Sequence, residues 1–449
     1  MVIPEPEELI RSCREAVAAA DPVRMNGRIA EVIGLLIESS GPACSVGDIC
    51  VVERAGNCVG RAEVVGFKGN RTLLMPLGPV EGLCPGLAVV ATKKPLQVPV
   101  GNGTLGRVLD GLGAPLDGQG PVHAQGTRPV FSAIPNPLTR SRITRSFETG
   151  VRSIDALITV GRGQRMGIFS GSGVGKSVLL GMMARNCRSD VNVIALIGER
   201  GREVREFIER DLGEEGLQRS VVVVATSNEP ALIRLKGAMV AATIAEYFRD
   251  QGLDVLFMVD SVTRLAQAQR EVGLAVGEPP ATRGYTPSVF AMLPTFLERA
   301  GTSDHGTITG MFTVLVEGDD LDEPIADSAR SILDGHIVLS RRLANRNHFP
   351  AIDVLSSISR CMPDVVTPEH ASLGGRIKDV MAVYRENEDL IQIGAYPAGS
   401  NERIDRAIRL HEPLNGFLRQ QRDERSPFAE SLDALLALEK STVSRSGGA

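Results

Sequence analysis

Apolar stretches and helical segments alternate along the middle of the chain, between about Gly150 and Arg341. The apolar stretches read RMGIFS, VNVIALIG, SVVVVAT, DVLFMVDS, ITGMFTVLV and HIVLS. Between several of them lie segments with apolar residues at helical spacing, such as ALIRLKGAMVAATIAEYF. Strands that are apolar throughout are typical of parallel sheets covered by helices on both faces. The pattern therefore predicts an α/β domain built on a mostly parallel sheet.

The regions on either side of this alternation differ in texture. From Arg24 to about Val98, short β-branched runs separated by Gly, Pro and Asn-Arg turns predict a small β-barrel. A Pro/Gly-rich stretch follows and predicts turn-rich structure leading into the α/β domain. From about Pro368 the periodicity is helical, and the final STVSRSGGA is typical of a frayed tail. The expected domains are a β-barrel over 23–98, the α/β domain over 99–367 and a helical domain over 368–449.

The first residues of the chain predict a short amphipathic helix. Apolar residues recur at helical spacing over 7–20, and Asp21-Pro22 ends the pattern, so the helix is expected within 1–22. Its apolar face could pack on the protein's own domain or on another protein. Periodicity does not distinguish these two uses.

Composition adds constraints on location and partners. At 449 residues, the chain is too long for one hydrophobic core, and we expect two or three domains. A net charge of -5 gives no overall field that would draw the chain to nucleic acid or to an anionic membrane. Seven cysteines without a C-x-x-C pair indicate free thiols in a reducing compartment. Without a secretory signal or a long apolar run, the pattern favours a cytosolic protein.

A glycine-rich turn lies where the strand RMGIFS meets the helical segment SVLLGMMARN. Glycines let the backbone curl so that successive N–H groups point at phosphate oxygens, and the helix adds its positive end. Lys176 would reach the β- and γ-phosphates, and the Ser177 hydroxyl would bind Mg²⁺. Together these features predict a P-loop. Its nucleotide-binding residues would be Gly171, Ser172, Gly173, Val174, Gly175, Lys176, Ser177 and Val178.

One residue of this turn departs from the usual P-loop pattern. Ser170 stands where the first glycine is usually found, so one small residue replaces another. The alternative is a glycine-rich turn with a solvated lysine. The strand before the turn and the helix after it disfavour that alternative.

Two carboxylates follow other apolar strands of the same predicted sheet. Asp260 ends DVLFMVDS, and Glu199 follows VNVIALIG, so both should emerge at the edge that carries Lys176. Asp260 would hold the metal, and Glu199 would orient and polarise the attacking water. Each residue also has a plainer interpretation: Asp260 as a helix cap, and Glu199 as a first-turn glutamate that favours a helix N-terminus.

With these residues identified, the chain resembles the hexameric rotary-type ATPases related to the ATP synthase catalytic subunit, and especially the flagellar protein-export ATPases. The resemblance runs from about Arg24 to Leu418. It implies a RecA-like P-loop NTPase core with an N-terminal β-barrel and a C-terminal helical domain, and an enzyme that hydrolyses ATP with Mg²⁺. The segments that carry it are GVRSIDALITVGRGQRMGIFSGSGVGKS, NVIALIGERGREVREFIE, DSVTRLAQAQREVGLAVGEPPATRGYTPSVF, TVLVEGDDLDEPIADSARSILDGHIVLSR and FPAIDVLSSISR.

The resemblance implies roles for individual residues near the P-loop. Lys176 would bind phosphate, while Ser177 and Asp260 would serve Mg²⁺. Glu199 would activate water, and Arg200 would support that site.

Two further roles depend on the resemblance alone. Arg360, in SSISR, matches the arginine that such enzymes insert into the neighbouring subunit's site, where it would neutralise charge on the transferring phosphoryl oxygens. Phe349 matches a position where relatives place a tyrosine against adenine, and ring stacking would survive this change. A surface ion pair for Arg360 and a core position for Phe349 are the alternatives.

The family resemblance also implies partners and a location. It implies a homohexameric ring, a regulatory partner at the N-terminal helix, and a C-terminal domain that faces export substrates, chaperones and the membrane export gate. The ring would lie in the cytoplasm, peripherally associated with the inner-membrane export apparatus. The loop GLAVGEPPATRGYTPSVF would face the central opening, or it could be a plain surface turn.

Within the family, three segments favour the flagellar branch over the injectisome secretion ATPases: GSGVGKS, VGRGQR and ENEDLIQIGAYPAGSNERIDRAI. A ring ATPase acting on nucleic acid is a rival from another class. Such an enzyme needs stacking aromatics in its β-domain, yet residues 24–98 contain a single aromatic, Phe67, so we expect no nucleic-acid partner. A non-catalytic ring subunit is disfavoured because Lys176 and Glu199 are both present.

Overall fold

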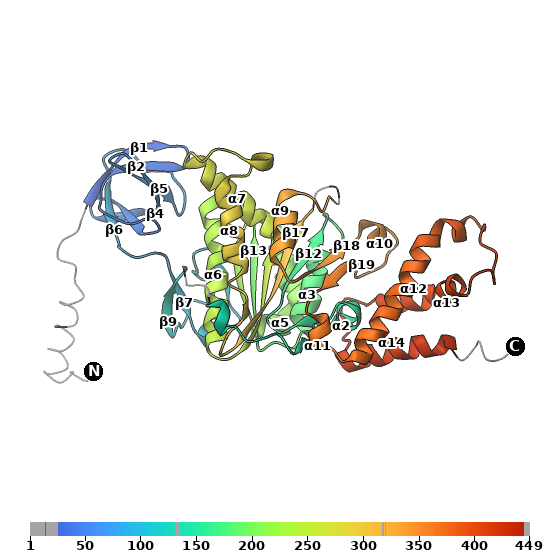
Figure 1. Cartoon of the computed structure of the whole chain (residues 1–449). Helices are drawn as coiled ribbons and strands as arrows, with labels where there is room; N and C mark the ends of the chain where they lie inside the picture. Colours follow the sequence, from blue (N-terminus) through green and yellow to red (C-terminus); the bar gives the residue numbers. More distant parts are fainter. Residues whose placement is uncertain (1–13, 15–25, 132–134, 317, 319, 444–449) are drawn as a thin grey trace, which may run out of the picture. The chain divides into compact units, whose positions relative to one another are not determined.

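The computed structural model describes residues 14, 26–131, 135–316, 318 and 320–443 (Figure 1). The helix predicted within 1–22 falls almost entirely outside these residues, as does the part of the predicted tail after Val443. The chain forms two compact units, Met1–Leu96 and Gln97–Ala449.

The first unit contains the predicted β-barrel, which is confirmed as a closed antiparallel barrel. Alternate residues of the strands point inward, as pleating requires, and Ile37, Val64 and Leu74 are fully buried there. In barrel order, the strands are β1 (Asn26–Ile33), β2 (Leu36–Ser40), β5 (Arg71–Pro76), β4 (Asn57–Lys68), β3 (Ile49–Arg54) and β6 (Ala88–Ala91).

The second unit is built on a nine-stranded sheet. All six apolar stretches predicted as strands are strands of this sheet, and their neighbours pair in parallel. In sheet order, the strands are β19 (Ile352–Ser359), β18 (Gly335–Leu339), β12 (Arg165–Ser170), β17 (Thr307–Leu315), β15 (Asp254–Asp260), β13 (Val191–Ile197), β14 (Ser220–Ala225) and β8 (Val108–Asp110), with β16 (Gly301–Thr302) beside β17.

Two edge strands extend the sheet beyond the pattern-based prediction. β8 comes from the Pro/Gly-rich stretch expected to be turns and pairs in parallel with β14. β19 runs antiparallel to β18 and closes the other edge. β8 is only three residues long, too short for a recognisable period, and its place is decided by pairing with a distant strand.

Helices cover both faces of the sheet, as the apolar strands require (Figure 1). Successive residues of β15 show the two faces: Leu256 and Met258 belong to the cluster that packs on α3, whereas the ring of Phe257 packs edge-on against Phe296 of α8. The principal helices of this domain are α3 (Lys176–Asn186), α6 (Ala231–Asp250), α7 (Val262–Ala275), α8 (Pro287–Leu297) and α9 (Pro324–Ile332).

Shorter elements connect the sheet and its covering helices. They are β7 (Gln97–Val100), η1 (Asn102–Thr104), β9 (Gly126–Pro129), η2 (Pro137–Thr139), β10 (Ser146–Phe147), α2 (Arg152–Leu157), β11 (Val160–Gly161), α4 (Gly201–Glu206), the π-helical η3 (Phe207–Leu212), α5 (Gly213–Gln218), η4 (Thr282–Gly284), α10 (Arg341–Asn345) and α11 (Met362–Val365).

The C-terminal part is helical, as predicted, with α12 (Pro368–Gln392), α13 (Glu402–Leu418) and α14 (Phe428–Val443). The side chain of Thr367 caps α12 by accepting a hydrogen bond from the amide of His370. Among the helices in the described part of the chain, none is long and apolar enough to cross a membrane.

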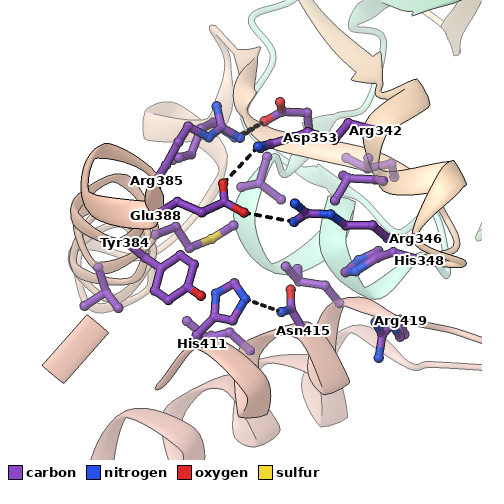
Figure 2. A pocket seen from close by; sticks show the side chains of 18 of the residues that line it. Arg342, Arg346, His348, Asp353, Tyr384, Arg385, Glu388, His411, Asn415 and Arg419 are labelled. Carbon is purple, nitrogen blue, oxygen red and sulfur yellow. Dashed lines mark hydrogen bonds and ion pairs between the residues drawn. The ribbon is translucent and has the colours of Figure 1, made fainter. Parts of the chain in front are cut away.

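Ion pairs join α12 to the sheet domain across a cavity (Figure 2). The carboxylate of Glu388 pairs with Arg342 of α10 at 2.9 Å and with Arg346, directly after α10, at 3.0 Å. Arg385 of α12 pairs with Asp353 of β19 at 2.6 Å. Because both carboxylates are largely buried, these pairs are less screened than surface pairs and fix the position of α12 on the sheet domain.

A buried ion pair holds the covering helices on the other face. Arg299 follows α8 and makes two 2.7 Å hydrogen bonds to Glu246 of α6, with both side chains about 5% exposed or less. Arg299 also donates to the carbonyl of Val130, so it joins α6, α8 and the segment after β9. The guanidinium therefore stabilises three segments that are distant in sequence.

We expect Glu246→Ala to lower the free energy of unfolding by about 3–5 kcal/mol, because the substitution leaves a buried guanidinium without this carboxylate. Glu209→Ala is the matched control. It breaks an exposed pair with Arg205 and should cost less than about 1 kcal/mol. Urea titrations of both variants measure the difference, and similar losses in the two would contradict the assignment.

Candidate functional site

The glycine-rich turn links the end of β12 to the start of α3. Its backbone requires glycine at two positions, because Gly173 has a φ of 75° and Gly175 a φ of 91°. Val174 lies between them with 1% of its side chain exposed and anchors the turn in the core, whereas Ser172 and Ser177 are exposed. α3 begins directly after the turn, so its first-turn amides, which have no partners within a helix, lie beside the turn, as an anion site requires.

Lys176, Asp260 and Glu199 converge at this edge of the sheet. The Nζ of Lys176 lies 2.5 Å from Oδ1 of Asp260 and 3.6 Å from Oε1 of Glu199. The arrangement follows from strand register, since Leu196 of β13 pairs with Asp260 at the end of β15. Parallel strands bring their carboxyl ends to one edge, and three such ends supply the three charges.

Burial and charge determine the protonation of this cluster. Burial opposes the charge on Lys176, but Asp260 and Glu199 outweigh it and raise the pKa of the ammonium above its ordinary value. For Glu199, burial is the main cause that raises the pKa to about 7; Lys176 opposes the rise and Asp260 adds to it. A carboxyl with a pKa near neutrality is suited to accept a proton from water.

Thr313 belongs to the site and was not predicted from the sequence. Its hydroxyl donates to Oδ1 of Asp260 at 2.8 Å, and the residue lies in β17, the strand between β12 and β15. The hydroxyl and Lys176 both donate hydrogen bonds to the same carboxylate oxygen, and together they fix the orientation of that carboxylate. The available signal was a threonine in the buried part of an apolar strand.

The donor set at this edge fits a magnesium ion. The Ser177 hydroxyl and the Asp260 carboxylate are hard oxygen donors, the type that Mg²⁺ prefers. Over the described ranges, no group of three or more His, Cys, Asp or Glu side chains could hold a metal by itself. Mg²⁺ usually keeps several waters and is bound through one or two protein oxygens plus substrate phosphates, so two protein donors are enough.

The ring of Phe349 lies against the glycine-rich turn. A β-carbon placed on Gly175 would lie 3.4 Å from Cδ1 of Phe349, and 40% of this phenylalanine is exposed. The carbonyl of Phe349 accepts a hydrogen bond from the backbone N–H of Gln420, just after α13. Val178, on the first turn of α3, is 37% exposed. Phe349 is therefore an exposed aromatic surface beside the turn and not a core residue.

Two predicted site residues are not brought to Lys176. Arg200 is exposed and pairs with Glu203 at 2.7 Å, one turn further along α4. Arg360 is exposed and follows β19, whose last residue, Ser359, pairs with Gly335 at the start of β18. The glycine-rich turn follows the opposite end of β12.

The separation of Arg360 from the turn can be estimated from register. Ser170 is level with Leu339 at the end of β18, whereas Arg360 is level with its start. Four residue steps along a strand span roughly 13 Å. Within one chain, Arg360 and Lys176 therefore lie at opposite ends of the sheet's strands: Lys176 at the carboxyl ends of the parallel strands and Arg360 at their amino ends.

Family models match three parts of the chain. The nucleotide-binding domain of the ATP synthase alpha/beta family matches residues 150–359, and the β-barrel domain of the same family matches residues 29–93. The C-terminal domain of the type III secretion ATPase EscN matches residues 366–437. Together the three matches follow the barrel, the sheet domain and the C-terminal helices.

Individual relatives match along nearly the whole length. The chain is 54% identical over 432 residues to the flagellum-specific ATP synthase of Bacillus subtilis (strain 168), covering 95% of this chain and 98% of that protein. The assembled ATPase EscN of the enteropathogenic E. coli type III secretion system superimposes with a TM-score of 0.87 and 44% identity, covering 92% of this chain and 99% of that one. EscN in complex with its central stalk EscO gives a TM-score of 0.86 and 43% identity, with the same coverage.

Proposed function

This chain belongs to the ATP synthase alpha/beta family, in the branch of flagellum-specific ATP synthases and type III secretion ATPases, and we propose that it hydrolyses MgATP as a homohexameric ring that energises flagellar protein export. The observation that carries the proposal is the convergence of Lys176, Asp260 and Glu199 beside the glycine-rich turn. A phosphate-binding turn, an ammonium, a metal-binding carboxylate and a carboxylate with a pKa near 7 are the groups that phosphoryl transfer to water requires.

The turn and α3 bind the triphosphate in this proposal. The backbone amides of residues 171–175 and the positive end of α3 cradle the phosphates, and Lys176 contacts the β- and γ-phosphate oxygens. Ser177 and Asp260 hold Mg²⁺, which neutralises charge on the phosphate oxygens when it is bound. Thr313 keeps the Asp260 carboxylate oriented for this task. Phe349 supplies the face against which the adenine ring stacks.

Glu199 positions and deprotonates the attacking water. Its burial makes it a stronger base than an exposed glutamate, because the raised pKa means a higher affinity for the proton. Lys176 beside it keeps a useful fraction of the carboxyl ionised near neutral pH. Arg200 would act on this site through Glu203, whose pKa is lowered because the guanidinium outweighs the effect of burial.

The ring follows from the position of Arg360. Arg360 is exposed at the amino ends of the parallel strands, whereas its own P-loop lies at their carboxyl ends, so it cannot reach its own nucleotide. It can reach the nucleotide of a neighbour that packs against this end of the strands. There the guanidinium would neutralise charge that spreads over the phosphoryl oxygens in the transition state. A head-to-tail contact of this kind generates a closed ring when the rotation closes.

The proposed partners and location are inferred by analogy with the related ATPases. A regulatory partner would bind the N-terminal helix, and export substrates, chaperones and the membrane export gate would meet the C-terminal helices. By analogy with EscN and its central stalk EscO, a stalk protein is expected to be a further partner. The proposed location is the cytoplasm, at the inner-membrane export apparatus. The injectisome role is the alternative, and export of flagellin by a strain that lacks this gene would argue for it.

We expect kcat/KM for ATP to rise with pH, to reach half its maximum near pH 7 and to level off at higher pH, because Glu199 acts only when ionised and its pKa is about 7. Glu199→Gln should be nearly inactive at every pH. Glu203→Gln tests whether the pH profile reports the ionisation of Glu199 and not the ionisation of ATP. Since the Glu203 carboxyl raises the pKa of Glu199, its removal should move the midpoint to lower pH. A midpoint that does not move would show that Glu199 does not control the profile.

We expect Arg360→Ala to lower kcat by about 10³-fold or more and to keep nucleotide binding, because the guanidinium acts on the transition state of the neighbouring site. Activity should return when this variant is mixed with Lys176→Ala, which keeps Arg360. Random mixing gives complete sites at about a quarter of the ring's interfaces. Arg188→Ala, at an exposed arginine paired with Glu148, is the control and should stay fully active. Failure of the mixture to recover would disprove a shared site.

A further inference from the structure

We propose that Gln164 is a positioning residue that holds Arg360 in place for the neighbouring subunit's active site. The inference rests on the proposed role of Arg360. Gln164 immediately precedes β12, the strand that ends at the P-loop, and its side chain is fully buried. It does not touch the P-loop, so it would act on hydrolysis only through another residue.

The side-chain amide of Gln164 bridges the segment that carries Arg360 and the segment before β18 to which the Arg360 backbone is hydrogen-bonded. Its Nε2 donates to the carbonyl of Asp334 at 2.9 Å and to Oγ of Ser359 at 3.0 Å. Its Oε1 accepts from the amide of Gly161 at 2.7 Å. Because a backbone N–H can only donate and a carbonyl can only accept, these partners define which end of the amide is nitrogen.

The Asp334 carbonyl is shared between Gln164 and Arg360. It accepts the Gln164 amide and the backbone N–H of Arg360, the latter at 3.0 Å. A carbonyl oxygen has two lone pairs, and both are used here. Gln164 therefore binds Ser359 directly, through its hydroxyl, and meets Arg360 only through the carbonyl that both of them bind.

Asp334 is itself clamped by the first residue of β12. The guanidinium of Arg165 makes a bidentate pair with the Asp334 carboxylate at 2.9 and 3.0 Å. The amide of Arg165 donates to the same carboxylate at 3.1 Å, and the amide of Asp334 donates to the Arg165 carbonyl at 2.9 Å. The shared acceptor is thus fixed independently of Gln164, and loss of Gln164 would release the side chain of Ser359, the residue directly before Arg360.

The proposal predicts a kinetic effect beyond loss of stability. Gln164→Met keeps the length of the side chain and removes its hydrogen bonds. Since misplacement of a catalytic group by about 1 Å can cost about 10²-fold, kcat should fall at least about tenfold, whereas KM for ATP should change less than about twofold. Ser359→Ala removes one of the same hydrogen bonds. It should give a smaller loss of the same kind, and it carries the test if Gln164→Met fails to fold.

Mixed rings distinguish positioning of Arg360 from damage to β12 and its P-loop. Gln164→Met has an intact P-loop, so mixing it with Lys176→Ala, which supplies a well-placed Arg360, should restore activity to the level of the Arg360→Ala and Lys176→Ala mixture. Mixing Gln164→Met with Arg360→Ala should restore none, because neither subunit offers a positioned arginine.

Two results would overturn the inference. The first is wild-type kcat in both Gln164→Met and Ser359→Ala. The second is a Gln164→Met and Lys176→Ala mixture that stays inactive while the Arg360→Ala and Lys176→Ala mixture recovers, since this places the damage in the variant's own site. If the Arg360→Ala mixture itself does not recover, the shared site is wrong, and the positioning role is wrong with it.

Discussion

The buried ammonium of Lys176, held between two carboxylates, is the interaction on which the rest of the site depends. A lysine this deeply placed keeps its charge because Asp260 and Glu199 outweigh the cost of burial. The same charge keeps part of the Glu199 carboxyl ionised, although burial raises its pKa to about 7. The protonation of Lys176 and that of Glu199 are therefore coupled, and a change in either residue alters the other.

The parallel sheet imposes a second constraint, because the carboxyl ends and the amino ends of its strands present different residues. The carboxyl ends of the strands bring the charged residues together around the P-loop. The antiparallel strand β19 returns the chain to the amino ends of the parallel strands, where Arg360 follows it. In the proposed ring, a subunit with its phosphate site at one end of the strands and Arg360 at the other end would complete a site only together with a neighbour. β12 connects these two ends, with Gln164 before its first residue and the glycine-rich turn after its last.

The C-terminal helices are tied to the same region. Glu388 and Arg385 of α12 pair with α10 and β19, and the amide after α13 binds the carbonyl of Phe349 beside the P-loop. The C-terminal helices therefore contact the segment that places Phe349 next to Gly175.

The sequence by itself determined the six apolar strands, the barrel, the C-terminal helices and the three charged residues at strand ends. It did so because periodicity reports burial, and because parallel strands must bring their carboxyl ends together. Tertiary structure alone decided the contact of Thr313 with Asp260, the contact of Phe349 with Gly175, the edge strands β8 and β19, and the bonds of Gln164. Each of these joins residues distant in sequence, so it depends on strand order and register, which follow from long-range packing and leave no local period to read.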